Sequence, residues 1–192
     1  MRKDLALAAI ACGMLLSSGC ASLNSSVPFQ YQPSLISSGQ QIEKSAAFTL
    51  LTDDRPEKDR KYTKSIKDVP DKITSKLIED FQASRLFKDV HYLPQDNDDI
   101  IISGTIRRFK WKLYAAPISY IPYVNLVLVF GIPAQTAYGV VDIELVLQDK
   151  ATGEELGRFS AASEVNTHYT IYNFKSGEAG AELAESLRDV AK

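Results

Sequence analysis

The chain has 192 residues, of which 45% are hydrophobic and 24% are charged, and its formal net charge is −2. These values are typical of a single globular domain with a core of its own. The slight negative charge argues against a dedicated nucleic-acid binder, because such proteins carry a strongly basic face.

The first twenty residues are organised like a secretory signal. Arg2 and Lys3 precede an apolar run from Leu5 to Leu16, and small residues follow it. The run is shorter than the roughly 20 apolar residues that a transmembrane helix requires, which favours a cleaved signal over a membrane span. Both cysteines of the chain, Cys12 and Cys20, lie here, so the remaining sequence has no thiol for a disulfide.

The end of this signal, LLSSGC, resembles the lipobox of bacterial lipoproteins. Ser17 stands where Leu is most common in that motif, and Leu16 is displaced by one position. The resemblance implies cleavage after Gly19, a diacylglycerol on the Cys20 thiol, an acyl chain such as palmitate on its new amino group, and no other cofactor. The alternative is an ordinary signal peptide that is cut near the same place.

The lipoprotein resemblance also implies a location. Ala21 after the cysteine is similar to the pattern of outer-membrane lipoproteins, so we expect an outer-membrane anchor with the domain facing the periplasm. Residues 1–19 are then the signal peptide, and residues 20–45 are the lipidated cysteine and a flexible tether rich in Ser, Gln and Pro. The expected folded domain spans residues 46–192.

The first half of this domain alternates between strand and helix patterns. Residues 46–53 predict a strand, the charge-rich run 53–62 predicts a solvated loop, and residues 68–87 predict a helix with Asp68 as its cap. In the helix, apolar residues recur on one face, at Ile73, Leu77, Ile78 and Phe81. Residues 88–93 then predict a short strand that contains His91, and residues 96–99 a turn.

The second half predicts long strands. In residues 99–114 the apolar positions change phase after Arg107 and Arg108, which indicates a β-bulge. Residues 138–165 predict a hairpin that turns at residues 149–155. Residues 176–192 predict a helix with Ser176 as its cap and with Leu183, Leu187 and Val190 on one stripe.

This order predicts an α+β fold, a two-layer sandwich of a mixed or antiparallel sheet with two helices on one face, plus an apolar insertion at 114–137. The order also resembles YajG-type envelope lipoproteins, through Asp53, Asp54 and Arg55 after a strand and through Asp149, Thr152 and Gly153 in the hairpin turn. A looser likeness is to LptE and the periplasmic domain of CsgG. These relatives share a scaffold but not one activity, so the likeness implies a fold rather than a reaction.

Catalytic motifs are not evident in the sequence. His91 and His168 lie in separate predicted elements, without metal-ligand spacing, and there is neither a glycine-rich phosphate loop nor a nucleophile elbow. We therefore predict that the protein is not an enzyme and has no catalytic residue and no metal site.

No charged residue lies between Lys112 and Asp142. Pro117, Pro122 and Pro133 argue against one spanning helix, because an interior proline costs a helix about 3 kcal/mol. Three interpretations stay open: a part of the core, a surface for a protein partner, or a segment at the membrane interface. The residues predicted to make the membrane or partner contact are Tyr120, Ile121, Tyr123, Val124, Leu126, Leu128 and Phe130.

A run of cations and aromatic residues precedes this segment. Its charged members could contact anionic lipid headgroups, and they are Arg107, Arg108, Lys110 and Lys112. The sequence therefore predicts a lipid-anchored envelope protein with a binding or assembly role, a membrane contact through the anchor, an envelope protein as partner and no nucleic acid. The alternatives are a carrier for lipid or lipopolysaccharide and, less favoured, an envelope enzyme.

Overall fold

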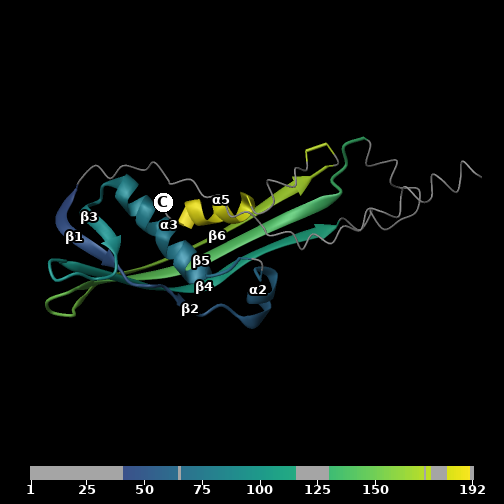
Figure 1. Ribbon diagram of the computed structural model, residues 1–192. Coiled ribbons are helices and arrows are strands. Elements are labelled where there is room, and N and C mark those ends of the chain that lie inside the picture. The colour runs from purple at the N-terminus through teal and green to yellow at the C-terminus, as the bar shows by residue number, and fades with distance from the viewer. Residues whose placement is uncertain (1–40, 65, 116–129, 171, 174–180, 191–192) are drawn as a thin grey trace, which may run out of the picture.

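The computed structural model describes residues 41–64, 66–115, 130–170, 172–173 and 181–190 (Figure 1). The strands are β1 (Ile42–Phe48), β2 (Thr52–Asp53), β3 (Phe87–Tyr92), β4 (Ile100–Ala115), β5 (Gln135–Asp149) and β6 (Glu155–Tyr169). The described helices are α2 (Glu57–Tyr62), α3 (Val69–Ser84) and α5 (Ala181–Val190). The predicted α+β class is confirmed.

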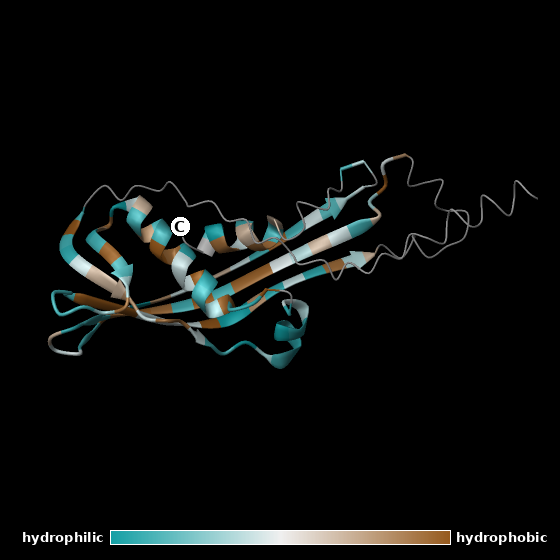
Figure 2. Cartoon of the chain, viewed as in Figure 1, coloured by the Kyte–Doolittle hydropathy of each residue, from teal (hydrophilic) through white to brown (hydrophobic). Residues whose placement is uncertain are grey.

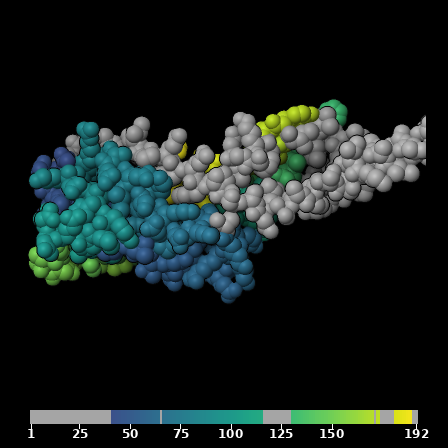
Figure 3. All heavy atoms as spheres, viewed as in Figure 1, coloured from purple at the N-terminus to yellow at the C-terminus, as the bar shows by residue number. Residues whose placement is uncertain are grey.

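The six strands form one mixed sheet in the order β3-β1-β4-β5-β6, with β2 pairing beside β1 along the same edge of β4. β1 is parallel to both β3 and β4, whereas β4, β5 and β6 are antiparallel to one another. In Figure 1 the far ends of β4, β5 and β6 extend to the right, away from the thicker body that Figure 3 shows around β1, β3 and α3.

The core lies between one face of the sheet and the helices α3 and α5. Ile73 and Leu77 of α3, and Leu183 and Leu187 of α5, are buried against apolar side chains of the strands. The strand side of this core is made by alternate residues: Phe48, Ile102, Ile106, Phe109, Val141 and Ile143. The predicted layer of two helices on one face is therefore present, and brown positions mark it in Figure 2.

The change of phase in β4 is a bulge, as the sequence predicted. Ile106 pairs with Ile143 and Arg108 pairs with Asp142, so Arg107 is an extra residue without a partner position. The bulge keeps Phe109 on the core face after Ile106, whereas unbroken alternation would have turned it outward.

The long helix begins where the sequence predicted, but not by the predicted contact. Asp68 occupies the N-cap position of α3 with a left-handed backbone (φ 52°), and its side chain makes no capping hydrogen bond. Pro70 lies in the first turn, where its missing N–H costs nothing. The predicted cap Ser176 of the last helix lies outside the described residues.

Two predicted boundaries at the start of the domain differ from the structure. β1 begins at Ile42, so residues 42–45, predicted as tether, form strand and pair with β3. The charge-rich run 53–62, predicted as a solvated loop, contains the helix α2, which lies beside β4 on the side away from α3 and α5 (Figure 1). Polar composition hid both elements, because their stability comes from contacts with neighbouring strands.

Candidate functional site

The antiparallel ladder of β4 and β5 places the candidate site. It runs without interruption from the bulge to Ala115 paired with Gln135, so strand residues occupy both ends of the predicted 114–137 insertion. Phe130, which was predicted as a contact residue, is 84% exposed. The other predicted contact residues lie outside the described residues, namely Tyr120, Ile121, Tyr123, Val124, Leu126 and Leu128, as do Gly19 and Cys20.

Arg107, one of the four predicted headgroup cations, has a partner within the protein. Its guanidinium forms an ion pair with Glu144, and Arg158 Nη1 lies 2.5 Å from the other oxygen of the same carboxylate. The hydrogen bond from Arg158, aided by the charge of Arg107, holds the pKa of Glu144 below its usual value against the opposing effect of burial. The charge of Arg107 is therefore paired by Glu144, although about half of the Arg107 side chain stays exposed (51%).

Arg108 is also held by a carboxylate. Its Nε lies 3.6 Å from Oδ2 of Asp59 in α2, and Asp59 is only 1% exposed. Within the described ranges, the carboxylate oxygens of Asp59 accept no hydrogen bond, so Arg108 supplies the opposite charge that this buried group requires. The ion pair between Arg108 and Asp59 thus links α2 to β4.

Lys110 and Lys112 differ from the two arginines, because tyrosine rings surround them instead of carboxylates. The Nζ of Lys110 lies 5.3 Å from the ring centroids of Tyr62 and Tyr138. The Nζ of Lys112 lies 5.1 Å from the Tyr62 centroid and 4.1 Å from that of Tyr114. We call these five residues the lysine–tyrosine face; distances of this size are those of cation–π contacts.

The tyrosines also affect the ionisation of this face. Partial desolvation lowers the pKa of Lys112, but its interactions with Tyr62 and Tyr114 outweigh that effect and leave the pKa above its usual value. Burial, with a hydrogen bond to Glu164, raises the pKa of Tyr138. At neutral pH these two shifts keep the Lys112 ammonium group charged and the Tyr138 phenol neutral.

The aromatic residues between these cations point the other way. Phe109 and Trp111 are buried in the core, and Trp111 Nε1 donates a 3.0 Å hydrogen bond to Glu182 of α5. The alternation of cations and aromatics therefore reflects the two faces of a strand, and it is not a single surface on which bases could stack.

The charge-rich run at 53–62 is organised around a buried cation. Arg55 is 6% exposed and donates from Nε and Nη2 to the two carboxylate oxygens of Asp53, each at 2.8 Å. Its Nη1 donates to the Thr63 hydroxyl at 2.9 Å. The Arg55 hydrogen bond is the main reason that the pKa of Asp53 lies below its usual value. This cluster holds the α2 region in place.

The histidines are not brought together. His91 Nε2 lies 3.1 Å from the buried carboxylate of Asp98, and its Nδ1 lies 3.4 Å from Asp89. His168 is exposed on β6, where its Nδ1 lies 3.0 Å from the Thr136 hydroxyl. Among the described residues, no three His, Cys, Asp or Glu side chains are placed to hold a metal ion.

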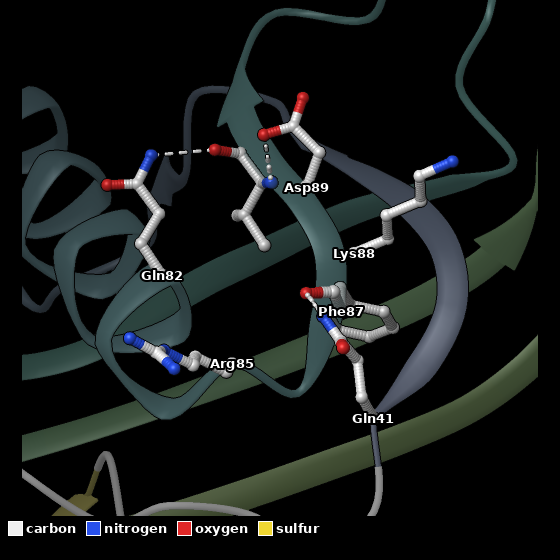
Figure 4. A pocket seen from close by; sticks show the side chains of 7 residues that line it. Gln41, Gln82, Arg85, Phe87, Lys88 and Asp89 are labelled. Atoms are coloured by element: carbon white, nitrogen blue, oxygen red, sulfur yellow. Dashed lines mark hydrogen bonds between the residues drawn. The ribbon is translucent and has the colours of Figure 1, made fainter.

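A shallow pocket lies at the opposite end of the molecule, beside the edge strand β3 (Figure 4). Two side-chain amides of its lining already donate to backbone carbonyls: Gln82 Nε2 to Val90 at 2.7 Å and Gln41 Nε2 to Phe87 at 3.3 Å. The lining holds no nucleophile next to a base, and its residues are Gln41, Gln82, Arg85, Phe87, Lys88, Asp89 and Val90.

Sequence reasoning did not identify Tyr62 or Tyr138 as members of the lysine–tyrosine face. Tyr62 lies at the end of a charge run that was predicted as a loop, and only its contact with β4 reveals it. Tyr138 could have been found, because the hairpin register places it directly opposite Lys112. In the part of the chain that the structure describes, no helix is both long and apolar enough to cross a bilayer.

Comparisons with known proteins give a fold and no family. No protein-family model matches the chain, and no curated protein matches it significantly. A Xanthomonas campestris protein of family DUF330 superposes with a TM-score of 0.50 at 8% identity, over 84% of this chain and 87% of that one. This likeness indicates a shared fold.

Bacterial lipoproteins are among the other structural neighbours. A minor lipoprotein from Acinetobacter baumannii has a TM-score of 0.42 at 9% identity, over 79% of this chain and 87% of that one. An uncharacterized lipoprotein B from Nitrosomonas europaea has a TM-score of 0.44 at 11% identity, over 80% and 83%.

Proposed function

We propose that the mature protein is a bacterial envelope lipoprotein, anchored in the outer membrane by Cys20, with a non-enzymatic binding or assembly role in the periplasm. The lipobox-like ending of the signal supports the anchor, and the order of elements supports the YajG-type likeness. The two ends of the uncharged segment leave the sheet together, at the far end of β4 and β5. This hairpin carries the proposal, because the described ends of β4 and β5, between which the uncharged segment lies in the sequence, extend away from the body of the domain (Figure 1).

The contact that we propose for this segment is with the membrane or with an envelope protein partner. Either contact would act beside the lipid anchor, so even a weak second attachment gains from the high effective concentration that the anchor provides. Phe130 is the first described residue before β5, and its side chain is exposed. This exposure supports a contact role for the segment over a place in the core.

The anchor is tested by labelling cells with a fatty acid. We expect the native protein to incorporate label and to sediment with membranes, and Cys20→Ala to lose both properties. Cys12→Ala is the matched control, since it removes the other thiol of the chain and should leave labelling unchanged. Labelling of Cys20→Ala equal to the native level would contradict the anchor.

The second contact is tested by flotation with liposomes of a protein of residues 21–192, which keeps every described residue. A variant with Val124, Leu126, Leu128 and Phe130 changed to Ser is compared with it. Flotation of the native form alone supports a membrane contact. If neither form floats, an unchanged thermal melt of the Ser variant supports a protein partner, whereas a cooperative loss of the fold would assign the segment to the core and overturn the contact.

A further inference from the structure

The lysine–tyrosine face lies on the side of the sheet opposite to the core helices. Lys110 and Lys112 project from β4 and both approach the Tyr62 ring, while Tyr138 lies beside Lys110 and Tyr114 beside Lys112. Tyr62 and Tyr114 are about two-fifths exposed, and both lysines are partly exposed, so solvent reaches the whole set. The face is therefore a surface that is open to a ligand.

The two ammonium groups of this face are not neutralised by an ion pair with a described carboxylate. Among the residues that the structure describes, neither lysine lies within ion-pair distance of a carboxylate, although both neighbouring arginines do. Acidic groups on the same side have other neighbours: Glu144 pairs with Arg107, Asp59 with Arg108, Glu164 interacts with Tyr138, and Asp142 occupies the strand position opposite Arg108. Lys110 and Lys112 are therefore cations of this face that no described carboxylate neutralises at ion-pair distance.

The tyrosine rings around the lysines favour a ligand that combines an anionic group with an uncharged part. Lys112 also has side-chain hydrogen bonds with Tyr62 and Tyr114, but an ammonium group has three N–H donors, so at least one of them can still donate to an oxyanion. The hydroxyls of Tyr62 and Tyr114 lie beside the same ammonium group and can also donate. Tyrosine beside lysine is also the composition found where proteins meet the headgroup layer of a membrane.

The position in the hairpin selects the kind of anion. Lys112 is three residues from Ala115, a distance of about 10 Å along a strand, and the uncharged segment follows. If the hairpin end meets the acyl boundary of a bilayer, this distance puts the lysines at the level of the headgroups, whose phosphates are the anions available there.

We propose that Lys110 and Lys112, framed by Tyr62, Tyr114 and Tyr138, bind the phosphates of anionic phospholipids when the β4–β5 hairpin meets a membrane surface. This assignment rests on the membrane contact proposed above and adds a lipid preference to it. It places the headgroup contact on two of the four predicted cations, because Arg107 and Arg108 already pair with carboxylates of the protein.

The test is flotation of residues 21–192 with two kinds of vesicle, phosphatidylcholine alone and phosphatidylcholine mixed with phosphatidylglycerol, at low salt. We expect the native form to bind the anionic vesicles more tightly than the neutral ones. K110Q/K112Q should bind the anionic vesicles about thirtyfold more weakly than the native form, the change expected for two lysines at an anionic surface. K110R/K112R should keep the preference. K67Q/K88Q removes the same charge at two exposed lysines elsewhere, and should change binding less than twofold.

The outcomes separate this inference from the contact on which it rests. Loss of binding to both vesicle types in the four-Ser variant tests the contact, whereas loss of the anionic preference alone in K110Q/K112Q tests the lysines. Equal binding of native protein and K110Q/K112Q to anionic vesicles would overturn the inference. Binding of soluble glycerol phosphate as tight as binding of anionic vesicles would also overturn it, since the membrane would then add nothing to a free phosphate ester.

Discussion

Trp111 in β4 and Glu182 in α5 are joined by a buried hydrogen bond of 3.0 Å from the indole Nε1 to the carboxylate Oε2. The other carboxylate oxygen, Oε1, accepts a hydrogen bond from the hydroxyl of Tyr169 at the end of β6. One side chain of the last helix thus ties together two strands that lie on either side of β5. Because Glu182 is only 1% exposed, this polar contact fixes where α5 sits on the sheet.

Glu182→Ala should therefore destabilise the domain strongly. The change removes the buried acceptor to which the Trp111 indole and the Tyr169 hydroxyl both donate, and the loss of a buried partner costs about 1–3 kcal/mol for each donor. We expect urea denaturation to give a loss of about 3 kcal/mol or more. Glu185→Ala, on the exposed side of the same helix, is the control and should stay within about 0.5 kcal/mol of the native protein. An equal loss of unfolding free energy in the two variants would show that the buried hydrogen bonds of Glu182 do not stabilise the fold.

Gly139→Ala is expected to displace α5. A Cβ at this position would lie 2.6 Å from the backbone carbonyl of Glu182 and 2.8 Å from the amide of Leu183, which cannot move aside as a side chain could. Overpacking of this kind costs about 1–3 kcal/mol. In Gly157→Ala the new methyl meets only the flexible, exposed ring of Phe159, so its melting temperature should change little. A Gly139→Ala protein as stable as Gly157→Ala would contradict the close contact.

The sequence predicted those features that follow from local apolar periodicity. The helical face at Ile73 and Leu77 and the bulge at Arg107 left a periodic pattern, and the hairpin turn near Gly153 left turn-forming residues. The contacts that position the elements left none. Arg55 lies within a run of charges, and its burial depends on acceptors from Asp53, from Thr63 and from the β4 backbone.

The candidate site was predicted in part for the same reason. Lys110 and Lys112 were identified from composition. What distinguishes them from Arg107 and Arg108 is that the arginines pair with Glu144 and Asp59, which are distant in sequence. Long-range pairing of charges is not visible in one sequence, so four similar cations appeared equivalent.

The bulge in β4 makes the effects of two single deletions differ. Deleting Arg107 removes the extra residue, so that Ile106 and Phe109 still face the core in a regular strand. Deleting Lys110 instead shifts Trp111 and all later residues of the strand to the opposite face. We expect the Arg107 deletion to keep a cooperative thermal transition by circular dichroism, and the Lys110 deletion to lose it. A cooperative transition in both would argue against the assigned register.

Arg55→Ala should release the α2 region from the sheet. The change leaves the partly buried Asp53 carboxylate without its bidentate partner, and breaking such a pair costs about 3 kcal/mol. Arg60→Ala is the control, because its side chain is half exposed and lies 3.8 Å from Asp53. Limited proteolysis should cut Arg55→Ala near residues 57–62 faster than the native protein. Unchanged cleavage would mean that α2 is held by other contacts.

Glu144 gives a prediction about pH. The hydrogen bond from Arg158 and the charge of Arg107 lower its pKa in the folded state, so the ionised carboxylate stabilises the fold. A lowered folded-state pKa means that this stability is complete above the unfolded value of about 4.3 and is lost as the pH falls through the folded value. The urea midpoint of the native protein should therefore fall between about pH 6 and about pH 3.

Glu144→Gln should reduce this fall without abolishing it, because Asp53 and Asp149 also have lowered pKa values. The variant should be less stable than the native protein at neutral pH, and the two midpoints should converge in acid, where the native carboxylate is protonated. Glu154→Gln removes an exposed carboxylate in the β5–β6 turn and should follow the native curve. Parallel curves for native protein and Glu144→Gln at every pH would show that the Arg107 and Arg158 pairs do not stabilise the fold.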